Sequence, residues 1–165
     1  MEQGPRYSHQ SQGQAEQGCK ALEGQVRTLL HALGERTGVE FGPDHPVVAW
    51  AVRHSAFLLS VVRVQASGRT PHMILRSKPY SGELLCLGEV GWARDPAPLA
   101  GQSKLDARWT KMVWVGKVPR SDEHLLIPPG GSQPVKCRTV RRLPENGGRW
   151  SAEAVEAITS LPWAP

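Results

Sequence analysis

The sequence predicts an α+β protein in which two helices come first, followed by a small antiparallel β-barrel-like module and a short C-terminal helix. Before residue 66, apolar residues recur every three or four positions, which is the period of an amphipathic helix. Beyond residue 82 they alternate every second position, which is the period of a strand. Gly and Pro clusters separate these short alternating segments, as is typical of small barrels.

The first predicted helix begins at Ser11, because Ser11 and Gln14 form the S-x-x-Q version of a capping box. One apolar stripe follows at spacings of three and four over about six turns, and it consists of Ala15, Cys19, Leu22, Val26, Leu29, Leu30 and Leu33. Gly34 and Gly38 bracket the predicted end of the helix.

The second predicted helix begins near Pro46, with Asp44 or His45 as its cap, and runs to about residue 62. Apolar residues cover nearly its whole circumference and are interrupted by a narrow polar edge at Arg53 and His54. A helix of this kind is expected to be mostly buried or to pack against a partner.

The rest of the chain divides into three further regions. Residues 67–82 contain two turn clusters around a short apolar piece and are predicted to be a connector. Strands are predicted over 83–87, 90–92, 111–117, 124–127 and 135–142, and a helix capped by Ser151 over 151–159. The predicted organisation is therefore helices in 1–66, a connector in 67–82, a small basic β-module in 83–150, and a C-terminal helix and tail in 151–165.

Composition excludes several classes of protein. The chain has 165 residues, 39% hydrophobic and 21% charged, which fits one domain or two small ones and argues against a disordered polyelectrolyte. No run approaches the ~18–20 apolar residues of a membrane span, and the polar N-terminus lacks the apolar core of a secretory signal. Three widely spaced cysteines offer neither a disulfide framework nor a zinc knuckle. We therefore expect an intracellular protein.

The net charge of +5 is concentrated in one part of the chain. Residues 1–66 contain six basic and six acidic residues, whereas residues 101–150 contain ten basic and four acidic residues. The β-module is thus the part expected to meet a polyanion, the alternative being that its charges form an ordinary solvated face.

The last predicted strand carries a basic stripe. Lys136, Arg138 and Arg142 would share one face, with Arg141 on the other, and such a stripe could follow a phosphate backbone. The alternative is that these cations protect an exposed sheet edge from pairing. Four tryptophans of the module could stack on bases but are expected mainly in the core, namely Trp92, Trp109, Trp114 and Trp150. The histidines are scattered and predict no metal site.

Segment 8–16, SHQSQGQAE, is followed by an amphipathic helix that carries Arg27. It resembles the S-x-x-S-N-G-x-x-E signature of retroviral and retrotransposon integrases, with Gln12 where the family usually has Asn. The apolar stretch 46–59, GRTP at 68–71, KPY at 78–80, KLDAR at 104–108 and VWVG at 113–116 are similar, in this order, to the C-terminal part of copia-type integrases. The resemblance covers roughly residues 5–165.

The resemblance implies that residues 1–66 are the last helices of a truncated ribonuclease-H-like integrase core. Glu16 then corresponds to the third carboxylate of the family's Asp, Asp, Glu triad, which holds two Mg²⁺ or Mn²⁺ ions for strand transfer. The two Asp-bearing strands and the zinc module of the family have no counterpart in this sequence. Glu16 would therefore bind metal only in a complete triad, and this chain alone is expected to hold no cofactor and to be inactive.

The resemblance also implies DNA as the partner, in service of DNA integration, and a nuclear location during that action. The expected DNA contacts are Lys20, Arg27, Lys136, Arg138, Arg141 and Arg142. For Glu16 and Lys20 the alternative is an ordinary salt bridge between residues four apart on a helix. Neither a membrane nor a small-molecule substrate is expected.

Two other interpretations remain open. The apolar 46–62 helix could make the chain a protein-interaction module or a homo-oligomer, since a face that lacks its sheet would be buried against a partner. Alternatively, the chain is a decayed element without a selected activity.

Overall fold

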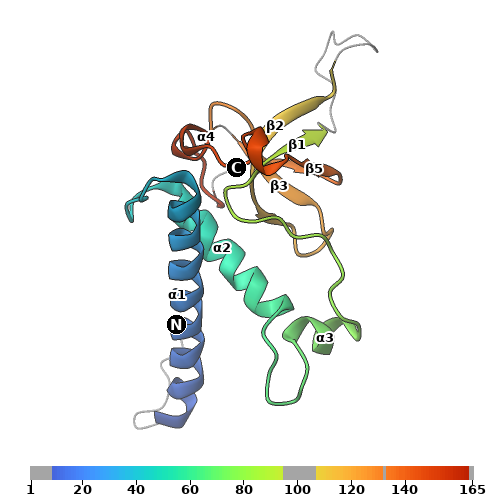
Figure 1. Cartoon of the computed structure of the whole chain (residues 1–165). Helices are drawn as coiled ribbons and strands as arrows, with labels where there is room; N and C mark the ends of the chain where they lie inside the picture. The colour runs from blue at the N-terminus through green and yellow to red at the C-terminus, as the bar shows by residue number, and fades with distance from the viewer. Residues whose placement is uncertain (1–8, 95–106, 132, 164–165) are drawn as a thin grey trace.

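The computed structural model describes residues 9–94, 107–131 and 133–163 (Figure 1). Within these residues the chain is α+β, with four α-helices and one five-stranded antiparallel sheet. Ser8 of the integrase-like signature and residues 104–106 of the KLDAR motif lie outside the described residues. The coarse prediction of helices first, strands second and a short helix last is confirmed.

Helix α1 (His9–Thr37) is longer than the apolar stripe predicts. It begins two residues before Ser11, so Ser11 lies inside the helix and the predicted capping position is wrong. It ends where expected, because Gly38 adopts a φ of 74° and donates its N–H to the Gly34 carbonyl at 2.8 Å. Leu33 is buried, whereas Ala15 and Cys19 are exposed, so only the C-terminal half of the stripe packs on the core.

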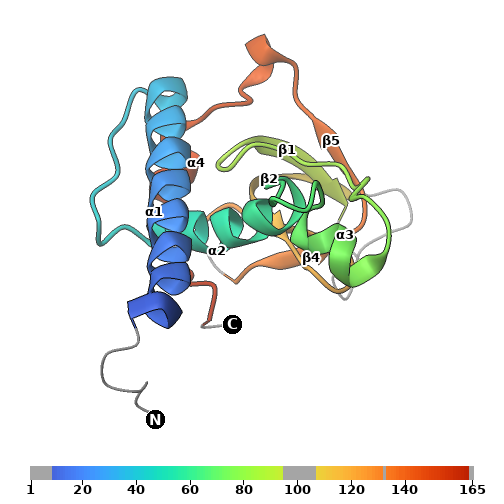
Figure 2. The ribbon, with the colours of Figure 1, turned by 90° about the horizontal axis from the view of Figure 1, so that it is seen from below.

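Helix α2 (Pro46–Val61) matches its prediction to within one residue. The His45 side chain is the cap and accepts a hydrogen bond from the Val47 N–H at 3.1 Å. Helix α2 contacts α1 and β2, and Figure 2 shows it crossing α1 and extending over the sheet. It buries Val47, Trp50 and Ala51 there, so the sheet that covers this apolar helix comes from the same chain.

Helix α3 (Pro71–Arg76) lies within the region predicted to be a connector, and that prediction is wrong in this respect. Thr70 caps the helix by accepting a hydrogen bond from the Met73 N–H at 3.1 Å, and Pro71 occupies the first turn. A Thr-Pro pair is a helix-start signal, which the flanking turn residues obscured.

The sheet has the strand order β4-β3-β2-β1-β5, with every neighbouring pair antiparallel. Its strands are β1 (Val90–Arg94), β2 (Trp109–Lys117), β3 (His124–Ile127), β4 (Val135–Cys137) and β5 (Val140–Arg142). The strand expected over 83–87 is irregular instead. Gly88, at φ 79°, and the hydrogen bond from the Glu89 N–H to the Cys86 carbonyl make a turn here. Contact with β2 begins at this turn, where the Gly88 N–H donates to the Trp114 carbonyl at 2.9 Å, and β1 itself begins at Val90.

The single strand predicted over 135–142 is two strands that lie at opposite edges of the sheet. Cys137 and Val140 both enter the same core cluster. Because three positions separate them, a continuous strand would point them to opposite faces, and the break between them allows both to point inward. The prediction that Arg138 and Arg142 share one strand is therefore wrong.

The short link between β4 and β5 forces the sheet to curve. Flat strands ~4.8 Å apart would place the two edges of a five-stranded sheet roughly 19 Å apart. Three Cα steps from Cys137 to Val140 reach at most about 11 Å. The sheet therefore bends its two edges toward each other, with a bulge between Trp114 and Gly116 that adds local twist.

Each face of the curved sheet has its own core. The concave side encloses a cluster centred on Trp114, with Met112, Leu126, Cys137 and Val140 around it. The convex side carries Val90, Val113 and Ile127, which pack with α2, the end of α1 and the C-terminal segment. Helices and sheet thus share one hydrophobic cluster.

Helix α4 (Ala152–Glu156) is shorter than predicted, but its cap is confirmed, because Ser151 Oγ accepts from the Ala154 N–H at 3.2 Å. It follows the 3₁₀ turn η1 (Glu145–Gly147). The tail after α4 is fixed on α2 by a 2.8 Å hydrogen bond from Trp50 Nε1 to the Ser160 carbonyl.

Candidate nucleic-acid interface

Tryptophans and cations gather on one exposed part of the convex side of the sheet. Trp92 on β1 lies directly opposite Lys111 on β2 and Arg141 on β5, and Arg94 lies opposite Trp109. Residues opposite each other in an antiparallel pair project to the same face, as do residues two apart in a strand. The five side chains therefore form one surface, called here the tryptophan–cation face: Trp92, Arg94, Trp109, Lys111 and Arg141.

The rings and the cations of this face are in contact. The Arg141 guanidinium lies 4.6 Å from the centre of the Trp109 ring, and the Lys111 ammonium lies 5.4 Å from that of Trp92. A cation held over a ring gains roughly 0.5–1 kcal/mol at an exposed site. To reach Trp109, Arg141 extends across β1, which lies between β5 and β2 in the sheet.

This face continues the helix-covered side of the sheet into solvent. Val90 and Val113 project to the same side as Trp92 and Lys111 but are buried in the cluster shared with the helices. Trp92, two residues after Val90, is 36% exposed, and Lys111, two residues before Val113, is also exposed. The strands run beyond the helices, and the exposed part carries three cations with no carboxylate among its five members.

Arg142, the residue after Arg141 on β5, binds a buried carboxylate. Arg142 donates from Nε and Nη2 to the two carboxylate oxygens of Glu89, at 2.8 and 2.9 Å. The Glu89 side chain is 1% exposed and also accepts from the Cys86 N–H at 3.0 Å, with Arg149 Nε 3.7 Å away. Hydrogen bonding to Glu89 raises the pKa of Arg142. Arg142, which the sequence predicts to contact DNA, thus also forms an ion pair with a buried carboxylate.

The other predicted contacts of the β-module lie at the β4 edge. Lys136 is exposed on β4, opposite Leu125. Arg138 follows β4, with its side chain 89% exposed and its Nε 3.8 Å from the Glu123 carboxylate. The structure therefore places these two residues at the β4 edge and outside the tryptophan–cation face.

Glu16, Lys20 and Arg27 share one exposed stripe of α1, because spacings of four and seven return to nearly the same side of a helix. Within the described chain, no ion pair joins Glu16 to Lys20. The described residues contain no group of three or more His, Cys, Asp or Glu side chains suited to a metal ion. None of the described helices is long and apolar enough to cross a bilayer.

Two buried histidines, His54 on α2 and His124 on β3, contact the ring of Trp114. The Trp114 Nε1–H donates to His124 Nδ1 at 3.0 Å, and the His54 ring lies edge-on to the Trp114 ring at 4.9 Å. Burial lowers the pKa of His54 to about 4. Burial, with the nearby charge of Lys117, lowers the pKa of His124 to about 4 as well. Both rings are neutral at pH 7, as the accepting Nδ1 of His124 requires.

Sequence reasoning expected Trp92 and Trp109 mainly in the core and did not assign a role to Arg94 or Lys111. Trp114, which is fully buried, does behave as expected. The signal for the exposed pair was the spacing W-x-R at 92–94 and W-x-K at 109–111, since each places a ring and a cation on one face of a strand. The spacing alone does not show that β1 and β2 both present this face to solvent, because that depends on the register in which the two strands pair.

The chain was compared with models of protein families, with curated proteins and with solved structures, and none of these comparisons found a match. The functional inference therefore starts from the surface chemistry of the chain itself.

Proposed function

We propose that this chain binds DNA through the tryptophan–cation face, as the C-terminal part of a copia-type retrotransposon integrase. The observation that carries the proposal is the placement of Lys111 and Arg141 over the rings of Trp92 and Trp109 on one exposed surface. The ordered resemblance of the sequence to that family is a second, independent support.

The chemistry of the face suits a phosphate backbone. Each cation that neutralises a phosphate releases condensed counterions, which is the main source of affinity in sequence-independent DNA binding. The tryptophan rings hold the two cations in place, so less side-chain entropy is lost when DNA binds. A guanidinium placed over a ring can still donate its N–H groups to phosphate oxygens, and Arg141 over Trp109 is such a group.

The proposal assigns binding to this chain and leaves strand transfer to a complete enzyme. A two-metal site requires several carboxylates close together, whereas Glu16 is exposed and belongs to no acidic cluster of the described residues. Among the described residues, the donor set therefore does not fit Mg²⁺ or Mn²⁺. Lys20 and Arg27, on the same stripe as Glu16, would add phosphate contacts along α1. Action on integrating DNA would occur in the nucleus.

The test measures the affinity of the purified chain for a labelled DNA duplex by fluorescence anisotropy at several salt concentrations. We expect log K to fall linearly with log salt, by about 0.9 for each phosphate contact. The variant Lys111→Ala/Arg141→Ala should lower this slope by roughly 1.8. The matched control is Arg63→Ala/Arg69→Ala, which removes the same charge from exposed residues outside the face and should change the slope by less.

Absence of binding near ~100 mM salt, or an affinity that does not change with salt, would overturn the proposal. Equal losses in the face variant and in the control would show that total charge matters and that the face does not.

Light scattering on the same samples tests the dimer interpretation. The sheet covers much of the apolar surface of α2, but Val52 on α2 and Val62 directly after it remain exposed. A stable dimer without DNA affinity would favour a protein-interaction module over the proposed function.

A further inference from the structure

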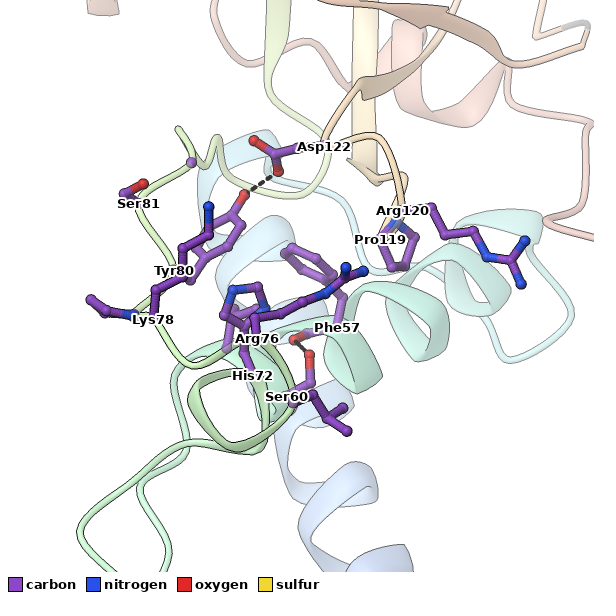
Figure 3. Close-up of a pocket in the computed structure, with 14 residues that line it drawn as sticks. Phe57, Ser60, His72, Arg76, Lys78, Tyr80, Ser81, Pro119, Arg120 and Asp122 are labelled. Atoms are coloured by element: carbon purple, nitrogen blue, oxygen red, sulfur yellow. Dashed lines mark hydrogen bonds between the residues drawn. The ribbon is translucent and has the colours of Figure 1, made fainter.

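A pocket of about 350 Å³ lies where α2, α3, the segment after α3 and the loop between β2 and β3 meet (Figure 3). The five residues of the tryptophan–cation face do not line it. Its size falls within the range of small-molecule sites.

Aromatic side chains form one wall of this pocket. The Tyr80 ring lies 5.6 Å from the Phe57 ring and 5.4 Å from the His72 ring, centre to centre, and is nearly perpendicular to both. Leu75 and Pro119 add apolar surface. Such a wall accepts a flat ring, because aromatic and apolar surfaces favour contact with another π system.

The Tyr80 ring of this wall is held in place by Asp122, which in turn pairs with Lys117. Tyr80 Oη donates to Asp122 Oδ1 at 2.7 Å, and Lys117 Nζ lies 3.3 Å from the same oxygen. The Lys117 side chain is 2% exposed, so its ammonium neutralises Asp122 from inside the protein. Burial and the contact with Asp122 raise the pKa of Tyr80, which keeps its hydroxyl protonated as the donor.

The remaining charge of the pocket is positive. Arg76, Lys78 and Arg120 line it and are exposed, whereas Asp122 is the carboxylate of the lining and is already paired. Figure 3 shows Arg76 on α3 reaching over the pocket, whereas Arg120 on the loop after β2 lies at its rim with its side chain extending outward. The chemistry of the site is therefore that of an anion attached to a flat apolar group.

The backbone around the pocket is strained at two places. Among the described residues, the non-glycine positions with positive φ are Ser77, at 56°, and Asp122, at 57°. Such residues cost free energy and cluster at ligand-binding sites. Ser77 ends α3 between two of the lining cations, and Asp122 holds the Tyr80 hydroxyl.

We propose that this pocket binds a nucleoside monophosphate group, with the base against the Phe57 and Tyr80 wall and the phosphate on Arg76, while Lys78 and Arg120 add positive charge at the rim. The group could belong to a free nucleotide or to the phosphorylated end of a DNA strand. The inference rests on the proposed function where it takes DNA as a source. A strand end fits better than the middle of a duplex, because three separate segments of the chain surround the pocket.

The experiment follows the amide signals of the full chain by NMR during titration with deoxythymidine monophosphate, thymidine, inorganic phosphate and phosphotyrosine. We expect the monophosphate to shift signals around Tyr80 and to bind at least about tenfold more tightly than the other three probes. Arg76→Ala/Arg120→Ala should weaken its binding by at least about tenfold, and the control Arg63→Ala/Arg69→Ala by less than about twofold.

A second pair of variants tests the wall without changing charge. A methyl group added at Gly82 would meet Tyr80 Oη and would lie 2.5 Å from Asp122 Oδ2, so Gly82→Ala must displace this pair. Gly42→Ala adds the same group where nothing lies within 4 Å. Weaker monophosphate binding in the first variant alone supports the proposal, and equal effects in both contradict it.

A second arm separates the two sources and the two proposals. If the source is a DNA end, a 5′-phosphorylated duplex binds more tightly than its 5′-hydroxyl form, and Arg76→Ala/Arg120→Ala removes that difference. A free nucleotide as the source predicts monophosphate binding without that difference. Monophosphate binding that persists in Lys111→Ala/Arg141→Ala while duplex binding is lost supports both proposals. No monophosphate binding, or tighter binding of phosphotyrosine, overturns this one while leaving DNA binding by the face intact.

Discussion

Arg141 and Arg142 are neighbours on β5, and they lie in two contrasting environments. Arg141 lies on the convex side in solvent, over the ring of Trp109, whereas Arg142 binds the buried carboxylate of Glu89. The alternation of a strand sends successive side chains to opposite faces, which separates the two environments over one residue. A basic run in a sequence can therefore combine structural charges and surface charges, and only their partners distinguish them.

The largest expected effect is a loss of stability at low pH, caused by the buried histidines His54 and His124. The unfolded chain binds protons on His54 and His124 near pH 6.5, but the folded chain takes them up only near pH 4. Stability should therefore fall as pH decreases from 6.5 to 4, by up to about 3 kcal/mol for each histidine. Urea unfolding across this pH range should show a shallower fall in His54→Gln and His124→Gln, measured against the wild type.

Glu89→Gln is the next largest change. It removes the charge that pairs with Arg142 and Arg149 but keeps an acceptor, and Arg142 is 41% exposed and can turn toward water. We expect a loss of about 2 kcal/mol in the free energy of unfolding. The control Glu145→Gln changes an exposed partner of Arg149 and should cost less than about 0.5 kcal/mol. Equal losses would show that burial of Glu89 is not decisive.

Arg141→Ala compared with Arg142→Ala tests the contrast directly. Removing Arg141 should lower the salt slope of DNA binding by about 0.9 and leave the free energy of unfolding within about 0.5 kcal/mol. Removing Arg142 should destabilise the protein by about 1–2 kcal/mol, because it leaves Glu89 with a weaker partner. The contrast fails if both variants change DNA binding equally and neither changes stability.

The smallest effect is expected from Arg138→Ala. Its side chain is 89% exposed and its distance from Glu123 is 3.8 Å, so the ion pair should contribute less than about 0.5 kcal/mol. Its position at the β4 edge predicts a smaller drop in salt slope than Arg141→Ala gives. A larger drop in the same anisotropy assay would move the DNA path from the tryptophan–cation face to the β4 edge.

The elements set by local signals could be predicted from the sequence. The bounds of α2 follow from Pro46 and its apolar run, and Ser151 caps α4 as its position indicates. Gly38 ends α1 because its left-handed backbone satisfies a helix carbonyl. In each case the physical cause lies within a few residues of the chain.

The features that depend on distant contacts could not be predicted. The break between β4 and β5 arises because Cys137 and Val140 fill the same core, and the tryptophan–cation face exists because β2 and β5 both pair with β1. The pairing of Arg142 with Glu89 joins residues 53 positions apart. The spacing of residues in the sequence shows which side chains of one strand share a face. The register between strands decides which of these side chains meet.

The two-residue link between β4 and β5 leaves no slack for β5 to reach β1 in the same chain. Short hinges are the setting in which proteins exchange elements between copies. Removal of Thr139 would shorten the link to one residue and should make pairing of β5 with the β1 of a second copy more favourable relative to pairing within one chain. The two residues of this link thus set how far β5 can move from β4 before it must leave the β1 of its own chain.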